Sequence, residues 1–403
     1  MPIGQGGANS QTQLRESQTV EPLDTIKKPI STKKRNLDVL TSWRFFAAAM
    51  VVFFHFGAKP FAAGPEVLLR IIKNGYQAVS FFFILSGFVL VYTYYDPASH
   101  TGMNTTPRRF WLARFARIYP VYALALVLAL PVFLWTALSK KSMSPLEIGL
   151  TLSLAPALLQ AWVPPICLAW NIPAWSLSVE AFFYLLFPWL ASTMLRWKTH
   201  SLLITSAVIA ISVHALQHCV FPLAETGAPG PVATSSHHFF AYSPIFHLAT
   251  FVFGMALGRA YLRISTQDRN SAFFNTLMIA SLASICILLS LHGLIRPVFL
   301  SDTVMVPIYG CLIFSSAHCS GMLEAVLGNR CLVALGNASY GIYIIHHPVG
   351  WWLSICLRPL YNRHAIWWFA LYFAVVVGAS LFIHKYFEMP LKNKCLTRFA
   401  PKK

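Results

Sequence analysis

Two ionisable residues, Arg44 and His55, lie eleven residues apart in the first long apolar segment of the chain. On a helix this spacing puts them within about 20° of one face and about 16 Å apart along the axis. An ionisable side chain in hydrocarbon costs roughly 2.5–3.5 kcal/mol on insertion scales, so both are functional candidates. An imidazole can take a proton from a hydroxyl nucleophile and pass it on. The structural alternative has His55 at a helix end and Arg44 reaching toward lipid headgroups.

A run of arginines follows in the segment PRRFWLARFARIYP, residues 107–120. It contains Arg109, Arg114 and Arg117, and the last two are i,i+3 neighbours on one helical face. Guanidinium groups form bidentate contacts with phosphates, so the segment is a candidate site for a phosphate-bearing ligand. Membrane topology alone also collects arginines on the cytoplasmic side, and this explanation stays open here.

Acidic residues are scarce, with 13 Asp plus Glu in the whole chain. Four of them lie at or near apolar segments: Asp38, Glu180, Asp302 and Glu388. Glu180 follows Trp175 by a turn or two in an apolar segment. As a functional residue it would orient a base or bind a sugar hydroxyl, and as a structural residue it would only form hydrogen bonds to neighbouring helices.

A small pair, Ser86 and Gly87, interrupts an otherwise bulky apolar segment. Small residues let a neighbouring backbone or a thin ligand approach closely, and plain helix packing is the commoner use. Tyr340 and His346 lie in another apolar segment, just before Pro348. Proline frees backbone carbonyls that neighbours or water must satisfy. His346 is a candidate to line the same cavity as His55, or to be a satisfied core histidine.

The composition excludes a water-soluble enzyme and a disordered chain. Of 403 residues, 56% are hydrophobic and 11% charged, with a mean hydropathy of +0.58. A soluble domain carries about 25% charged residues. We therefore predict an all-α, polytopic membrane helical bundle with about ten transmembrane helices. They are expected at roughly 38–57, 75–95, 115–138, 174–194, 202–220, 241–260, 272–293, 303–320, 333–357 and 365–387.

The segment 146–163 is short, carries Pro156 and ends in two prolines, so we expect it to be re-entrant or interfacial. With ten spans and a cytoplasmic N-terminus, most Lys and Arg fall on the inner side. Both termini are thus expected in the cytoplasm, and the net charge of +18 reflects topology rather than nucleic acid binding. The expected organisation is a disordered basic tail over 1–36, a transmembrane domain over 37–391 and a basic tail over 392–403. The stretch 221–236 is expected to be an outer loop.

Metal and disulfide chemistry are not indicated. The eight Cys occur singly, without a CxxC motif or Cys/His metal spacing, so no metal is expected. Walker, HExxH, GxSxG and dinucleotide-binding motifs are absent from the sequence. No inverted pair of broken helices of the transporter kind is visible.

The order of these motifs resembles the acyltransferase 3 family of integral-membrane acyltransferases. The resemblance covers about residues 37–391 and rests on six stretches in the family's order. They are Leu37-Asp38 through Arg44 to His55, Gly75 through Phe82 to Phe88, Arg109-Phe110 through Arg114 and Arg117 to Pro120, Trp175 through Glu180 and Tyr184 to Pro188, Leu335 through Ser339-Tyr340, Tyr343 and His346 to Pro348, and Tyr386-Phe387-Glu388-Met389-Pro390.

The resemblance implies transfer of an acyl group, commonly acetyl, from cytoplasmic acyl-CoA to a hydroxyl of a cell-surface glycan or its lipid-linked precursor. By motif, His55 is the essential histidine and Arg44 its partner, while Arg114 and Arg117 meet the coenzyme phosphates. The sequence departs from the family in two places. After Asp38 it reads Val39-Leu40-Thr41-Ser42-Trp43-Arg44, where Gly-Leu-Arg is usual, and it has His347 where an aromatic is common.

The mechanism expected from these residues has His55 remove the hydroxyl proton while Arg44 or a backbone dipole steadies the developing charge. Glu180 or Glu388 sets the tautomer of His55, and a covalent acyl-histidine is the minor variant. Arg109, Ser86 and Gly87 are expected along the coenzyme path, and Asp38, Trp175, Tyr340 and His346 in substrate binding. We expect a multi-pass protein of the bacterial inner membrane.

Two other classes of function remain possible from the sequence. A proton-coupled transporter or channel would use the intramembrane His and Arg residues as an ion path. A non-catalytic scaffold of a polysaccharide assembly complex would survive loss of His55 and Arg114. Release of thiol from acyl-CoA separates the three classes. The acceptor, the acyl chain and the oligomeric state are not specified by the sequence.

Overall fold

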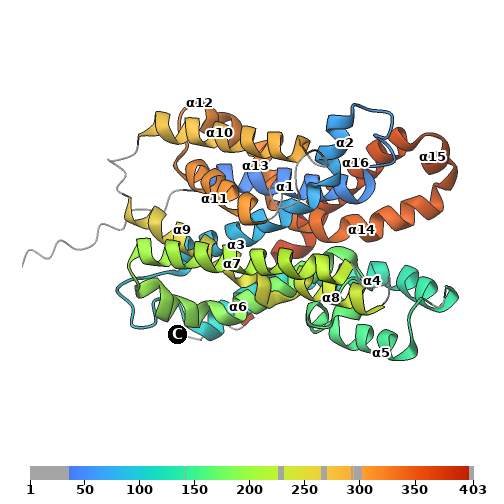
Figure 1. The fold of residues 1–403 in the computed structure, drawn as a ribbon, viewed down its shortest axis with the longest axis horizontal. Coiled ribbons are helices and arrows are strands. Elements are labelled where there is room, and N and C mark those ends of the chain that lie inside the picture. The colour runs from blue at the N-terminus through green and yellow to red at the C-terminus, as the bar shows by residue number, and fades with distance from the viewer. Residues whose placement is uncertain are drawn as a thin grey trace, which may run out of the picture. The chain divides into compact units, whose positions relative to one another are not determined.

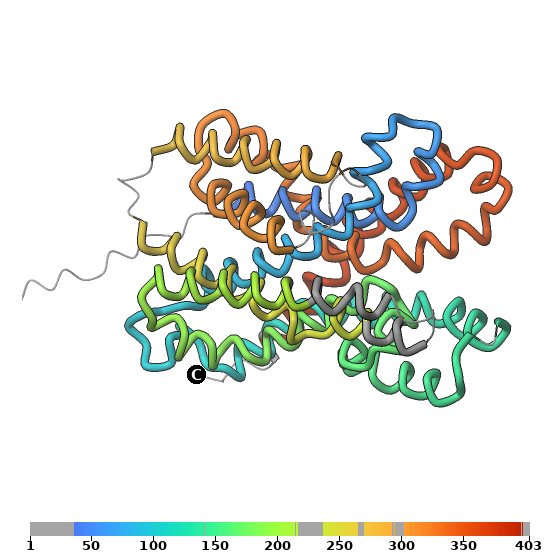
Figure 2. Tube along the Cα trace, viewed as in Figure 1, coloured from blue at the N-terminus to red at the C-terminus, as the bar shows by residue number. Residues whose placement is uncertain are grey.

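A computed structural model describes residues 36–140, 142–225, 231–264, 270–291, 294 and 302–398. By internal contacts the chain divides into Met1–Asn36 and Leu37–Lys403. The expected basic tail over 1–36 falls outside the described residues, apart from Asn36. In its described part the second unit consists of helices joined by turns and loops (Figures 1 and 2), with one isolated bridge between Tyr95 and Met103.

The α-helices follow one another along the chain, joined by turns and loops of different lengths. They are α1 (Asp38–Phe56), α2 (Glu66–Lys73), α3 (Ala78–Tyr94), α4 (Pro107–Ser139), α5 (Pro145–Leu154), α6 (Trp175–Thr193), α7 (Thr199–Glu225), α8 (Pro231–Tyr242), α9 (Pro244–Arg263), α10 (Ser271–Ser290), α11 (Asp302–His318), α12 (Met322–Leu327), α13 (Arg330–Asn337), α14 (Ser339–Cys356), α15 (Arg358–Arg363), α16 (Ala365–Ile383) and α17 (Met389–Arg398).

Short 3-10 and π turns connect some of these helices. The 3-10 turns are η1 (Gly75–Gln77), η2 (Gln160–Trp162), η3 (Pro164–Ile166), η4 (Ile172–Ala174) and η5 (Met194–Arg196), and η7 (His384–Glu388) is a π turn between α16 and α17. The stretch 221–236 is helical over 221–225 and 231–236, so the expectation of an outer loop was wrong for those residues. The C-terminal stretch, expected to be a tail from 392, continues as α17 to Arg398.

Seven helical stretches in the described part of the chain are long and apolar enough to cross a membrane: Asp38–Phe56, Glu66–Tyr94, Pro107–Ser139, Ile172–Arg196, His237–Arg263, Ser271–Ser290 and Ala365–Cys395. They match seven of the ten expected spans, and this is a multi-pass membrane protein. Helices also occupy the other three ranges, as α7, α11 and α13–α14. Within the part of the chain that was described, these helices do not meet the same criteria of length and hydropathy, and α7 enters the comparison only as Thr199–Val213. The total of ten therefore stays a prediction.

The segment 146–163 contains no helix long enough to span a membrane. Helix α5 ends at Leu154 after 10 residues, about 15 Å of helix, and a turn and η2 follow. The bundle binds this segment through hydrogen bonds to its backbone. Tyr122 Oη donates to the Ala155 carbonyl at 2.5 Å, and Ser178 Oγ donates to the Leu158 carbonyl at 2.6 Å.

Two prolines inside helices leave carbonyls that side chains from other elements satisfy. Pro348 has no N–H for the Ile344 carbonyl, which accepts from Asn171 Nδ2 at 3.1 Å. Pro188 leaves the Tyr184 carbonyl, which accepts from Trp111 Nε1 at 2.9 Å. The sequence-based expectation that neighbours satisfy the carbonyl freed by Pro348 is confirmed. These bonds tie α14 and α6 to the elements that surround them.

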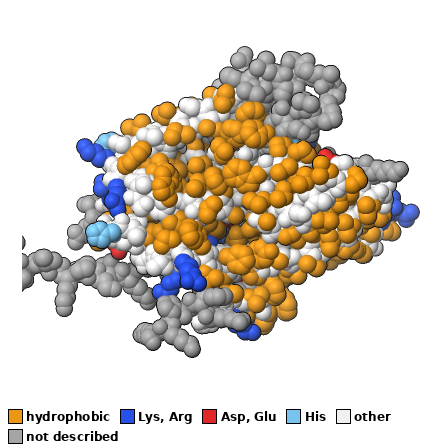
Figure 3. Space-filling model, turned by 90° about the horizontal axis from the view of Figure 1, so that it is seen from below, with side chains coloured by type: hydrophobic (Ala, Val, Ile, Leu, Met, Phe, Trp, Pro, Cys, Tyr) orange, Lys and Arg blue, Asp and Glu red, His pale blue; other side chains and the backbone are white. Residues whose placement is uncertain are grey.

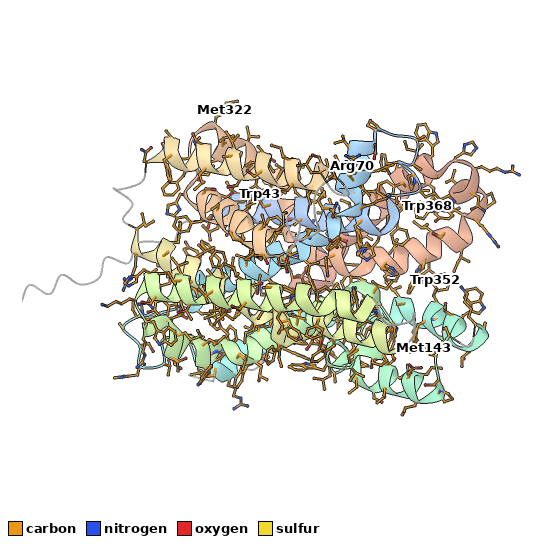
Figure 4. The ribbon with its side chains drawn as sticks, in the orientation of Figure 1. Trp43, Arg70, Met143, Met322, Trp352 and Trp368 are labelled. Atoms are coloured by element: carbon orange, nitrogen blue, oxygen red, sulfur yellow. The ribbon has the colours of Figure 1, made fainter. Side chains whose placement is uncertain are left out.

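The sides of the bundle are hydrophobic, as a lipid-facing protein requires. Exposed large side chains include Trp135, Leu185, Trp189, Trp367 and Phe382. Figure 3 shows one face covered mostly by hydrophobic side chains, with Lys and Arg mainly near its edges. In Figure 4, Met322 lies toward one end of the view, and Met143, Trp352 and Trp368 toward the other.

Candidate active site

A cavity opens between α1, α3, α4, α6 and α14, with a water-accessible volume of about 110 Å³, enough for several water molecules. Its wall combines three guanidinium groups, one carboxylate, and several hydroxyls with apolar side chains. The lining residues are Arg44, Val79, Phe82, Phe83, Leu85, Ser86, Val89, Leu90, Arg114, Arg117, Ile118, Ser176, Leu177, Glu180, Tyr184, Ser339, Tyr340 and Tyr343.

Arg114 is held by aromatic side chains while part of its guanidinium stays unpaired. Its Nη2 donates to Tyr94 Oη at 2.7 Å, and its guanidinium carbon lies 5.2 Å from the Tyr94 ring centroid and 5.9 Å from that of Tyr184. The buried Nε has no hydrogen-bond partner among the described residues. Because a buried donor without a partner is costly, this N–H suits an anionic ligand that enters the cavity.

Glu180 supplies the carboxylate of the cavity wall. Its Oε1 accepts from Tyr184 Oη at 2.5 Å and from Ser86 Oγ at 3.4 Å. Arg44 lies within electrostatic range of Glu180, and also of Arg117. The cavity therefore carries an excess of positive charge, with one carboxylate that holds hydroxyl donors in place.

Glu388 lies in the π turn η7 and is 5% exposed. Its Oε2 lies 2.9 Å from His384 Nδ1, one turn earlier. Arg44 and Lys392 both lie within its electrostatic range. Glu388 is thus close to the arginine cavity without being part of its lining.

The remaining expected site residues divide between the cavity and other places. Tyr340 lines the cavity, and its Oη donates to the Ile118 carbonyl at 2.6 Å. Ser86 also lines the cavity, whereas a Cβ on Gly87 would overlap the Phe251 carbonyl of α9. Gly87 therefore faces a packed helix rather than the expected coenzyme path.

Three further expected residues, besides Gly87 and Glu388, lie outside the cavity lining. Arg109 is exposed in the first turn of α4, where its backbone N–H donates to the Thr106 cap. Trp175 packs against Tyr242 and His247, at ring-centroid distances of 4.9 and 5.4 Å. Asp38 begins α1 beside Gly328, at the end of α12.

His55 and His346 form a pair at the far end of α1 from Asp38. His346 Nε2 lies 3.2 Å from His55 Nδ1, and His55 Nδ1 lies 3.0 Å from the Val51 carbonyl. Neither histidine belongs to the cavity lining among the described residues. Glu180 and Glu388 have the other partners described above, so the partner of His55 in this structure is His346 rather than either carboxylate.

Tyr343 lies next to both the arginine cavity and the histidine pair. It lines the cavity, and its Oη lies 2.7 Å from Ser176 Oγ. Its ring centroid lies 5.8 Å from that of Phe82 and 6.3 Å from that of His346. One aromatic residue thus contacts both halves of the candidate site.

Sequence reasoning missed several residues of this site. Tyr184 was part of a motif but received no role, although its i,i+4 spacing from Glu180 is a signal for their hydrogen bond. Ser176 and Tyr343 also lay in motifs without receiving a role. They and Tyr94 carry no such local signal, because their partners in the site come from other helices. Among the described residues, no three His, Cys, Asp or Glu side chains are arranged to hold a metal ion.

Comparison with known proteins gives the family. Residues 37–385 match the acyltransferase 3 family, described as an acyltransferase domain. The chain belongs to the acyltransferase 3 family. As a member of this family it is a membrane acyltransferase, which confirms the resemblance seen in its motifs.

Two curated relatives extend over most of this acyltransferase. It is 29% identical to the acyltransferase MdmB of Streptomyces mycarofaciens over 321 residues, which is 78% of this chain and 79% of that protein. It is 25% identical to the putative peptidoglycan O-acetyltransferase YrhL of Bacillus subtilis over 351 residues, 81% of this chain but only 52% of YrhL. No solved structure matches.

A third relative matches a short stretch of the acyltransferase. It is protein 2 in the picA locus of Rhizobium radiobacter, 48% identical over 61 residues, or 15% of this chain and 31% of that protein.

Proposed function

We propose that this acyltransferase moves an acyl group, commonly acetyl, from cytoplasmic acyl-CoA to a hydroxyl of an extracytoplasmic or lipid-linked glycan. The observation that carries the proposal is the cavity that gathers Arg44, Arg114 and Arg117 one aromatic residue away from a histidine pair. An arginine-lined cavity fits a polyanionic donor, and an imidazole fits activation of a hydroxyl.

The donor is proposed to bind through its phosphates at the arginines. Acyl-CoA is too polar to cross the bilayer, so its phosphates stay at the inner face. The unpaired Nε–H of Arg114 offers one hydrogen bond to a phosphate oxygen, and Arg117 offers a second positive group. The apolar side chains and hydroxyls along the rest of the cavity suit the thin pantetheine arm, which carries amides and methylenes.

The thioester is proposed to reach His55 past Tyr343 and Phe82. Both rings line the cavity and meet edge-to-face at 5.8 Å, and the Tyr343 ring centroid also lies 6.3 Å from that of His346. A rotation of Phe82 or Tyr343 would join the two halves. Changes of side-chain rotamer between the free and the bound state are common at binding interfaces.

The reaction transfers the acyl group from the thioester sulfur of the donor to the hydroxyl oxygen of the acceptor. The His55 imidazole takes the proton of the acceptor hydroxyl as its oxygen attacks the thioester carbon, so a C–O bond forms. The C–S bond then breaks, and the imidazolium returns the proton to the leaving thiolate. The products are an ester and free CoA. In the minor variant His55 itself carries the acyl group between donor and acceptor.

The acceptor is proposed to be a glycan that reaches His55 from the outer end of α1. The support comes from the position of His55 at the opposite end of α1 from Asp38, and from the relative YrhL, which is named as a putative peptidoglycan O-acetyltransferase. The expected setting is a bacterial cell membrane, with both termini of the chain in the cytoplasm.

The test is thiol release and label transfer by purified protein in proteoliposomes. Radiolabelled acetyl-CoA is supplied on one side and membrane glycans on the other. We expect CoA thiol to appear together with labelled glycan, and both to fall at least about 100-fold in His55→Gln. Full activity of His55→Gln would end the role of His55, and ion flux without thiol release would favour a transporter.

A further inference from the structure

The hydrogen bonds around His346 determine which of its nitrogens carries the proton. His346 Nδ1 lies 2.6 Å from the Tyr343 carbonyl oxygen. A carbonyl oxygen only accepts, so Nδ1 is the donor, and a neutral imidazole has only one N–H. His346 Nε2 therefore has a free lone pair and acts as an acceptor.

The same reasoning determines the state of His55. Its Nδ1 lies 3.0 Å from the Val51 carbonyl oxygen and 3.2 Å from His346 Nε2. Both of these partners are acceptors, so His55 Nδ1 carries the hydrogen and shares it between them. His55 Nε2 is consequently left with the lone pair that a general base needs.

We propose that His346 is a positioning residue, which holds His55 in its Nδ1–H tautomer and keeps Nε2 free to take the acceptor's proton. This rests on the proposed function, and it replaces both the expected carboxylate and the expected substrate-binding role of His346. When His55 is protonated, its Nδ1–H bond to His346 becomes charge-assisted and strengthens, and it weakens again when the proton passes to the leaving thiolate.

A neutral histidine suits this position better than a carboxylate would. His346 is fully buried, and an ionised carboxylate inside a membrane bundle carries a large desolvation cost. An imidazole offers one well-directed lone pair without a charge. The charged residues Glu180 and Glu388 instead have Tyr184 and His384 as partners.

The surroundings hold His346 rigidly. Tyr372 Oη on α16 donates to the His346 carbonyl at 3.1 Å. A Cβ on Gly350 would overlap the Phe56 ring, so α14 packs closely against the end of α1. Asn171 anchors the backbone two residues before His346, at the Ile344 carbonyl. Such support from neighbouring residues holds the His346 ring in hydrogen-bonding position against the His55 ring.

The test compares two substitutions of His346 by thiol release. His346→Leu removes the acceptor, and we expect kcat to fall at least about tenfold while KM for acyl-CoA stays within about twofold. His346→Gln keeps an amide oxygen that can accept near the position of Nε2, and we expect it to retain at least about a third of kcat. The control is His318→Leu, another buried histidine whose Nδ1 contacts a carbonyl of its own helix, which should leave kcat unchanged.

Several outcomes would overturn the proposal. These are wild-type kcat in His346→Leu, a raised KM with unchanged kcat, or equal loss in the Leu and Gln variants. Absence of thiol release by the wild-type protein would instead count against the proposed function.

A second measurement does not depend on activity or on folding of the His346 variants. ¹⁵N spectra of histidine-labelled wild-type protein, with His55 assigned by comparison with His55→Gln, should show His55 and His346 as Nδ1–H tautomers. An Nε2–H tautomer at His55 would overturn the inference.

Discussion

At the scale of single residues, Arg114 differs from the other arginines of its segment in how it is held. Tyr94 accepts from its Nη2 and lies with Tyr184 beside its guanidinium, which fixes the plane of the group. Arg109, five residues earlier, is exposed. A fixed guanidinium loses little side-chain entropy when it binds an anion, whereas an exposed arginine gains little from a solvated contact.

We therefore expect Arg114→Ala to raise the KM for acyl-CoA about tenfold or more, on the order of 1.4 kcal/mol of binding. Arg109→Ala is the matched control and should change KM less than about twofold. The measurement is the initial rate of thiol release against donor concentration. Equal effects of the two substitutions would indicate that the arginines serve topology rather than donor binding.

Cys167 is a second residue whose surroundings predict its chemistry. It is 2% exposed, and burial raises the pKa of its thiol to about 12. The thiolate is the reactive form, so at pH 8 only about 1 in 10⁴ molecules carries it. We expect a maleimide to leave Cys167 unmodified in the folded protein while it modifies the exposed Cys331. Peptide mass spectrometry gives the two rates, and comparable labelling would contradict the burial of Cys167.

At the scale of elements, α3 and α9 pack backbone to backbone through glycines. A Cβ on Gly87 would overlap the Phe251 carbonyl, and a Cβ on Gly254 would overlap the Ile84 carbonyl. In lipid there is little hydrophobic drive between helices, so close backbone contact is a main source of their association. This contact fixes the position of Ser86, which lines the arginine cavity next to Gly87.

Gly87→Ala should therefore destabilise the bundle by about 1–3 kcal/mol, since the added methyl forces the two helices apart. Gly378→Ala is the matched control, because a Cβ there meets no atom within 4 Å, and alanine favours the helix. Thermal unfolding in detergent measures both. A midpoint for Gly87→Ala at or above that of wild type would contradict the packing.

At the scale of the whole molecule, the number of membrane spans decides whether the two termini lie on the same side of the membrane. Among the described residues, seven helical stretches meet the length and hydropathy of a span, while α7, α11 and α13–α14 occupy the three further expected ranges. An odd number of crossings puts the two termini on opposite sides of the membrane, and an even number puts them on the same side. The basic segments favour ten crossings by the positive-inside rule.

Reporter fusions at the two termini test this count. With ten spans, a fluorescent protein that folds only in the cytoplasm should be bright at both ends, and alkaline phosphatase should be inactive at both. Opposite behaviour at the two ends would require an odd number of spans. Fusions in the 96–106 loop provide an internal control, since they should behave like the cytoplasmic termini.

Much of the site could be predicted from local sequence, and the rest could not for a physical reason. The sequence predicted four cavity residues, because placing an ionisable or polar side chain in hydrocarbon costs free energy and so marks it as a candidate. They are Arg44, Arg114, Glu180 and Tyr340. All four line the cavity. Trp175 and Asp38 stood out in the same way, yet they lie outside its lining, since the sequence does not show which way a helix face turns.

The sequence by itself determined that the chain is a membrane bundle of the acyltransferase 3 family, because hydropathy and the order of motifs are properties of the chain alone. Only the tertiary structure decided which polar residues meet. The bond between His55 and His346 joins α1 to α14 across 291 residues, and that between Ser86 and Glu180 joins α3 to α6. Contacts between distant helices depend on how each helix is rotated and packed, and rotation follows from the sum of all interfaces rather than from any one segment.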